Sequence, residues 1–340
     1  MKTSITTISG LYAFTLTLAI GTIGSASAAD QQAPEKNVHE KIVDTMHTLA
    51  KGPHVGFRSN HAKGIVVTGS FTPSADAPSL SKAPQFAKTV PVVVRFSDPT
   101  GVPTLPDASP DASPHGIAIR FQLPDGAITD IVSISYNGFP VATPEDFLTL
   151  LNAIASIKPD TPHPNQVEQF LATHPAAKTF VTTPKPPPVS FGTLAFFGVN
   201  AFKFTNAKGE SQYARYRIEP VGGVESLTKE QAEKAGSNYL MEELPKRIAK
   251  GPIKFRISAQ IAAVGDSIND GTMVWPNDRK LVELGILSLD KTVTDSAAEE
   301  KKLTFNPLTL VDGIEPSADP ILLSRPIAYA VSVGRRLSGK

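Results

Sequence analysis

Residues 58–71 read Arg58-Ser-Asn-His61-Ala-Lys-Gly-Ile-Val-Val-Thr-Gly-Ser-Phe71, a polar loop that leads into an apolar, β-branched run. More runs of this kind follow, and Gly, Pro, Asp and Ser separate them. With the first, they lie at residues 65–68, 90–96, 116–121, 128–134, 200–205, 213–218 and 254–261. Short strands with turn residues between them are typical of an antiparallel sheet or barrel. We therefore predict a fold dominated by β-structure.

Two segments beside these strands have the spacing of amphipathic helices. Apolar residues recur at helical intervals over residues 37–51 and again over residues 144–157. Thr143 is placed to cap the second helix, and Pro144 suits its first turn. Each helix should bury one apolar stripe against the main body.

Residues 227–250 also favour a helix, which Pro245 would kink or divide. Residues 158–190 are dense in proline and predict an irregular arm over the surface. Strands, then a helix, then strands again, without βαβ units, indicate an α+β fold. We expect residues 30–340 to form a single domain.

The composition excludes several classes of function. Lys and Arg total 33 and Asp and Glu total 32, so no field of one sign is present to attract nucleic acid or an anionic membrane. Cysteine is absent, which excludes disulfides, thiolate nucleophiles, zinc thiolate sites and iron–sulfur clusters. Any metal must therefore be held by His, a carboxylate, Tyr or a cofactor.

The first 29 residues are typical of a secretory signal. Lys2 precedes an apolar stretch from Gly10, and small residues end at Ala26-Ser-Ala-Ala29, so we expect cleavage after Ala28 or Ala29. A membrane anchor is the weaker alternative, because the apolar core is shorter than the roughly 20 residues that span a bilayer. We predict a secreted protein, periplasmic if the source is a Gram-negative bacterium.

Three clusters of residues are candidates for chemistry. His61 lies where a loop enters a strand, and an imidazole there can face a cavity or simply lie on the surface. Alternation along residues 94–97 puts Arg95 and Ser97 on one face of a strand, where the Arg can pair with a carboxylate and the Ser with a histidine ring, or where both face water. If the C-terminal segment is helical, Arg325 can stabilise a phenolate at Tyr329, four residues on; the alternative is a packed Tyr beside a solvated Arg.

At these residues the sequence resembles the catalase superfamily, and most closely its short catalase-related peroxidase branch. The resemblance runs from about residue 50 to residue 336, and the motifs occur in the order typical of the family. They lie at residues 58–71, 94–97, 116–121, 130–132, 200–206, 274–276, 313–317 and 325–329. The resemblance implies a catalase-like antiparallel β-barrel of about eight strands with flanking helices, without the C-terminal helical domain of full-length catalases.

The resemblance also implies a role for each matching residue. Tyr329 would be the phenolate ligand of a haem iron, and Arg325 would keep it ionised. His61 would be the acid–base group on the opposite, distal face, with Ser97 bonded to its ring. The matching positions that bind the haem propionates are Arg58, Arg95 and Arg336, and those that line the distal face or channel are Val132, Phe139 and Phe147.

One position departs from the family. Aligned without gaps from Asp130, the distal asparagine of the family falls on Ile134, whose apolar side chain cannot hydrogen-bond to peroxide. Asn137 faces the other way if the strand continues, although a local shift would bring it in. Because catalases use that amide to position peroxide, the resemblance implies weak catalase activity here.

The resemblance thus predicts a peroxidase with haem b (iron protoporphyrin IX). Its substrates would be hydrogen peroxide or organic hydroperoxides together with small organic electron donors, and it would form a homo-oligomer. Three alternatives remain: a true catalase, an enzyme that rearranges fatty-acid hydroperoxides, and a haem-binding or scavenging protein without turnover.

Overall fold

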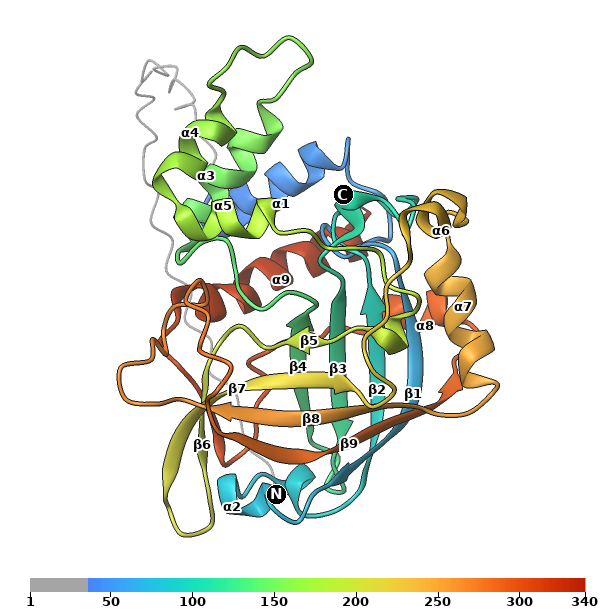
Figure 1. Ribbon diagram of the computed structural model, residues 1–340, viewed down its shortest axis with the longest axis vertical. Helices are drawn as coiled ribbons and strands as arrows, with labels where there is room; N and C mark the ends of the chain where they lie inside the picture. The colour runs from blue at the N-terminus through green and yellow to red at the C-terminus, as the bar shows by residue number, and fades with distance from the viewer. Residues whose placement is uncertain (1–35, 340) are drawn as a thin grey trace, which may run out of the picture. The chain divides into compact units, whose positions relative to one another are not determined.

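Eight antiparallel strands close into a barrel in the computed structural model, which describes residues 36–339 (Figure 1). Pairing between β7 and β8 closes the ring. Its strands are β1 (Gly64–Pro73), β2 (Val90–Ser97), β3 (Gly116–Gln122), β4 (Ile128–Ile134), β5 (Phe196–Phe197), β7 (Ser211–Pro220), β8 (Ile253–Ile261) and β9 (Leu281–Thr292). Two short strands, β6 (Phe202–Thr205) and β10 (Ile314–Pro316), extend the sheet from β7. The predicted barrel of about eight strands is confirmed.

Alternation along β2 separates the interior of the barrel from its outer face. Phe96 is fully buried, and its ring centroid lies 5.2 Å from that of Phe191 and 6.0 Å from that of Phe255. The side chains of Arg95 and Ser97 therefore point to the opposite face of the strand, as the sequence predicted. Because aromatic packing fills the interior, the outer face is where β2 presents its polar side chains.

Three long helices contact one another on one side of the barrel (Figure 1). They are α1 (Val38–Leu49), α3 (Pro144–Ala155) and α9 (Pro320–Ser338), and the first two confirm the predicted helices. Thr143 caps α3 by accepting a hydrogen bond from the backbone N–H of Asp146, as predicted. Within residues 36–339, no helix combines the length and the apolar character needed to cross a bilayer. The signal segment predicted at residues 1–29 lies outside the described residues.

The prediction of an irregular arm over residues 158–190 holds for residues 158–165 and 183–190 and is wrong between them. Two helices occupy much of it, α4 (Gln166–Thr173) and α5 (Pro175–Thr182). Asn165 and Glu168 form a capping box at the start of α4, and Pro175 lies in the first turn of α5, where a missing N–H costs nothing. Proline density here marks helix starts and the links between helices.

The helix predicted over residues 227–250 is two helices, α6 (Lys229–Lys234) and α7 (Tyr239–Ile248). The break lies at residues 235–238 rather than at Pro245, which α7 contains. The two remaining α-helices in the described part of the chain are α2 (Ala77–Leu80) and α8 (Ser296–Lys302). Helix α8 precedes the motifs at residues 313–317 and 325–329, and it contains Glu300, which contacts the candidate active site.

Candidate active site

A cavity of about 270 Å³ lies between the outer face of strands β2 to β4 and helices α1, α3 and α9. Every site residue that the resemblance predicted lines this one cavity. They are Arg58, His61, Arg95, Ser97, Val132, Phe139, Phe147, Arg325, Tyr329 and Arg336. The structure thus brings together motifs from the two ends of the chain, while the role of each residue stays a prediction.

The strand register builds the sheet side of the cavity. Arg95 on β2 lies opposite Ala118 on β3, which lies opposite Val132 on β4. In the next row Ser97 lies opposite Gly116, which lies opposite Ile134. Because residues directly across neighbouring strands share a face, all six point towards the cavity, which they also line.

His61 is held in place from two sides. Its ring Nδ1 lies 3.0 Å from Ser97 Oγ, and its backbone carbonyl accepts a hydrogen bond of 2.9 Å from Arg95 Nη2. The residue has a left-handed backbone, with φ of +53°, which non-glycine residues rarely adopt and which recurs at functional sites. These contacts keep the imidazole at the edge of the cavity in one orientation.

The surroundings of His61 favour a neutral imidazole. Burial, together with the positive charges of Arg95, Arg325 and Arg58, lowers the pKa of His61 to about 3. If Nδ1 carries the proton and donates it to Ser97 Oγ, Nε2 is the nitrogen that can accept a proton. His61 can therefore act as a base at any pH well above its pKa.

Gly116 makes room for the His61 ring. A Cβ atom at this position would lie 2.9 Å from both His61 Cε1 and Ser97 Oγ. We predict that Gly116→Ala displaces the imidazole and lowers the rate of peroxide consumption about 100-fold, since small misplacements of a catalytic group cost that much. The matched control is Gly222→Ala, where no atom lies within 4 Å of the added methyl group. A rate within twofold of the wild type in Gly116→Ala would show that the ring position is not critical.

Tyr329 and Arg325 face each other across one turn of α9. The Nε and Nη2 atoms of Arg325 both donate hydrogen bonds to Tyr329 Oη, at 3.0 and 2.9 Å. Nη1 of the same guanidinium donates to Asn200 Oδ1 at 3.0 Å, and Asn200 Nδ2 donates to Asp319 Oδ2 at 2.7 Å. Two donors from one cation stabilise a negative charge on the phenol oxygen, which suits it to bind a metal ion.

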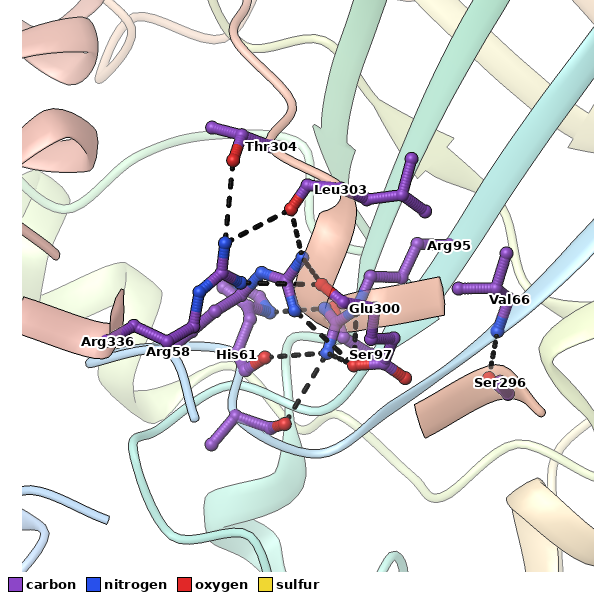
Figure 2. A network of polar contacts seen from close by, with 11 residues as sticks. Arg58, His61, Val66, Arg95, Ser97, Ser296, Glu300, Leu303, Thr304 and Arg336 are labelled. Atoms are coloured by element: carbon purple, nitrogen blue, oxygen red, sulfur yellow. Dashed lines mark hydrogen bonds and ion pairs between the residues drawn. The ribbon is translucent and has the colours of Figure 1, made fainter. Parts of the chain in front are cut away.

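Three arginines that line another part of the cavity surround Glu300: Arg58 and Arg95 contact its carboxylate, and Arg336 contacts its backbone carbonyl (Figure 2). Arg95 donates to Glu300 Oε2 through Nε at 3.0 Å and Nη2 at 2.8 Å, and Arg58 Nη1 lies 3.4 Å from the same oxygen. Arg58 and Arg336 both donate to the Leu303 carbonyl, at 2.9 and 3.3 Å. Burial, together with the charges of Arg95 and Arg336, lowers the pKa of Arg58 to about 8.

Ile134 lines the cavity beside Gly116, whereas Asn137 is engaged elsewhere. With its amide oriented to satisfy both groups, the side-chain oxygen of Asn137 accepts hydrogen bonds from Arg217 Nη1 and Nη2, at 3.0 and 3.2 Å. In the part of the chain that the structure describes, Asn137 is not among the residues that line the cavity. The local shift that would have brought this amide into the site does not occur.

Sequence reasoning assigned no role to three further sets of residues. Glu300 lies in a run of charged residues whose pattern is that of a solvated helix. Asn200 lies in the matched motif at residues 200–206, and that match could have identified it as a site residue. His115 Nδ1 lies 2.9 Å from Asp98 Oδ1, and both side chains are buried. Asp98 follows Ser97 at the end of β2, and His115 precedes Gly116 at the start of β3. Their contact therefore links the ends of β2 and β3 that carry Ser97 and Gly116.

Comparison with known proteins agrees with this geometry. The catalase family model matches residues 29–340. A catalase-related peroxidase from Synechococcus elongatus is 33% identical over 295 residues, which is 85% of this chain and 86% of the relative. A second one, from Mycolicibacterium paratuberculosis, is 33% identical over 289 residues, which is 84% of this chain and 90% of the relative.

Two solved structures share the fold. A fungal catalase superposes with a TM-score of 0.73 at 24% identity, and catalase A from Saccharomyces cerevisiae with a TM-score of 0.73 at 23% identity. The matches cover 84% and 87% of this chain but 61% and 64% of those two chains. The family model spans nearly the whole sequence, and two relatives exceed 30% identity over most of it. The chain therefore belongs to the catalase family of oxidoreductases.

Proposed function

We propose that this chain is a haem peroxidase that reduces hydrogen peroxide or organic hydroperoxides with small organic donors and has weak catalase activity. One observation carries the proposal: His61, from the start of the chain, and Tyr329, from its end, line the same cavity. Proteins of the catalase family bind haem, and haem b is the form we propose. We also propose that the protein is secreted, on the signal-like composition of residues 1–29, and that it is a homo-oligomer.

The residues around the cavity fit such a cofactor. Three arginines against one glutamate leave two positive charges, which matches the two propionate carboxylates of haem b. The phenol oxygen of Tyr329, held by Arg325, is the type of axial ligand that catalases use. The apolar side chains of Val132, Phe139 and Phe147 fit the flat apolar faces of a porphyrin.

Each residue then has a defined chemical task. When bound, haem supplies the iron centre at which the O–O bond of the peroxide is broken. His61 takes a proton from one peroxide oxygen and returns it to the departing oxygen, so one group serves as base and then as acid. Ser97 and Gly116 hold the imidazole for both steps. Tyr329 would bind the iron, Arg325 would hold the phenol oxygen in place through its two hydrogen bonds, and the arginine cluster would bind the carboxylates.

The cavity wall supports peroxidase over catalase activity. Ile134 lies next to Gly116 and hence close to the His61 ring, and its side chain offers peroxide no hydrogen bond. Asn137, the nearest amide in sequence, is bonded to Arg217. A second peroxide would therefore be positioned poorly, and an organic donor is the better reductant.

The test compares peroxide consumption by the haem-loaded protein with and without a phenolic or azo-dye donor. We expect the donor to raise the rate strongly, and we expect Ile134→Asn to raise the donor-free rate about 10-fold, because a hydrogen-bond donor aimed at a reacting oxygen stabilises the transition state. Ile154→Asn, at a site 41% exposed on α3, is the matched control. A high donor-free rate in the wild type that donors do not increase would make the protein a true catalase instead.

Product analysis with a lipid hydroperoxide separates a further alternative. Reduction to the alcohol, with two electrons taken from the donor for each hydroperoxide, supports a peroxidase. Formation of a rearranged product without consumption of donor would instead identify a hydroperoxide-rearranging enzyme.

A further inference from the structure

Among the described residues, Glu300 is the one acidic side chain that pairs with the arginines of this cluster. Its side chain is 13% exposed, whereas Glu299, the next residue towards the start of α8, is 34% exposed and pairs with Lys302 at 3.4 Å. The first residue of α8 is also anchored, because the Val66 N–H on β1 donates to Ser296 Oγ at 2.8 Å (Figure 2). The helix therefore turns one carboxylate inwards and holds it against the barrel.

Glu300 takes the edge of Arg95 that a ligand carboxylate would use. Both Nε and Nη2 of Arg95 donate to Glu300 Oε2, and Nη2 also donates to the His61 carbonyl. Nη1 is the remaining nitrogen of Arg95. A second carboxylate can therefore bind Arg95 only through this one nitrogen. A ligand carboxylate can form a strong two-point pair with Arg95 only by replacing Glu300.

The rest of the cluster favours such an exchange. Among the described residues, Arg336 donates only to oxygen atoms of Glu300, Leu303 and Thr304, at 3.3 to 3.5 Å, and its buried Nε has no hydrogen-bond partner there. Two guanidinium groups share the charge of one carboxylate and the third, Arg336, pairs with none among the described residues, which leaves capacity for further anions. The same carboxylate limits the repulsion among the buried arginines, so its removal destabilises the protein in the absence of a ligand.

We propose that Glu300 is an internal competitor for the carboxylates of the cofactor: it occupies the Nε–Nη2 edge of Arg95 and so weakens binding of a porphyrin that carries free carboxylates. This inference rests on the proposed function, because it concerns how the same cavity holds its cofactor. It assigns α8 the task of setting how tightly the porphyrin is held and how fast it exchanges.

The experiment measures binding of metal-free protoporphyrin IX and of its dimethyl ester to the full chain, by porphyrin absorbance and fluorescence. We expect Glu300→Gln to bind the free acid about 10-fold more tightly than the wild type does, with affinity for the ester unchanged, because only the free acid competes for Arg95. Glu299→Gln on the same helix should match the wild type with both porphyrins. We also expect Glu300→Gln to unfold at a lower temperature when no porphyrin is added.

The outcomes are distinct. An equal gain for free acid and ester, or no gain for either, would overturn the role of Glu300. Failure of the wild type to bind any porphyrin would instead overturn the proposed function. If Glu300→Gln does not fold, Glu300→Asp, which keeps the charge but shortens the side chain, should shift the affinity for the free acid in the same direction, and an unchanged affinity in that variant would also overturn the role.

Discussion

His61→Ala should lower the rate of peroxide consumption about 100-fold to 10,000-fold while the porphyrin stays bound, because acid–base catalysis by a positioned side chain contributes that much. The variant removes the one histidine that lines the cavity within residues 36–339, and it leaves Tyr329, Arg325 and the arginine cluster in place. The measurement is the rate of peroxide loss, with the haem absorption spectrum recorded on the same sample. The His61→Ala protein should therefore lose turnover but keep its haem.

His163→Ala is the matched control, because His163 is 75% exposed and pairs with Glu168 away from the residues that line the cavity. The pH dependence of the wild type gives a second check. Because the pKa of His61 is lowered to about 3, the imidazole stays neutral as the pH falls from 7 to 5, and the rate should stay flat over that range. Unchanged peroxide consumption in His61→Ala would rule out acid–base catalysis by His61.

Tyr329→Phe should abolish the tyrosinate-type absorption spectrum, release haem at least about 10-fold faster and lower peroxide consumption at least about 100-fold. The substitution keeps the ring and removes only the oxygen that would bind iron. It also leaves two nitrogens of Arg325 without their acceptor, since both Nε and Nη2 donate to Tyr329 Oη. The measurements are the visible spectrum, the transfer of haem to an excess of a scavenging protein, and the turnover rate.

Tyr136→Phe is the control for loss of a phenol oxygen. Tyr136 Oη lies 3.4 Å from Thr183 Oγ1, and among the described residues Tyr136 is not one that lines the cavity. This variant should keep the spectrum and the rate of the wild type. A Tyr329→Phe protein with an unaltered spectrum would mean that another residue binds the iron. The roles assigned to Tyr329 and Arg325 would then both be wrong.

Predictions that rest on local periodicity were confirmed. The two-residue repeat of a strand put Arg95 and Ser97 on one face and Phe96 on the other, and the structure has them on opposite faces. The four-residue spacing of Arg325 and Tyr329 put both on one face of a helix, and their side chains are hydrogen-bonded. Such statements depend only on backbone geometry over a few residues, which the sequence specifies directly.

Predictions that ignored specific helix-start signals were wrong. Proline density alone suggested an irregular arm, yet Asn165 with Glu168, and Pro175, begin two helices within it.

The strand β9 was not predicted. Its run of apolar residues is interrupted by Gly285, which has a φ of +151°. A Cβ atom added to Gly285 would lie 2.3 Å from the Thr72 carbonyl oxygen. Here a close approach of two backbones breaks the pattern that a strand usually shows.

By itself, the sequence determined most of the barrel strands, the shared face of Arg95 and Ser97, and, through a resemblance, the residues that share the cavity. Only the tertiary structure decided that Glu300 turns inwards to Arg95 and Arg58, that Asn137 bonds to Arg217, and that β8 closes the barrel on β7. The physical reason is that a charged side chain in a helix has the same local pattern whether it faces water or a buried cation. Its partner is set by contacts between segments far apart in the chain, and no local repeat records them.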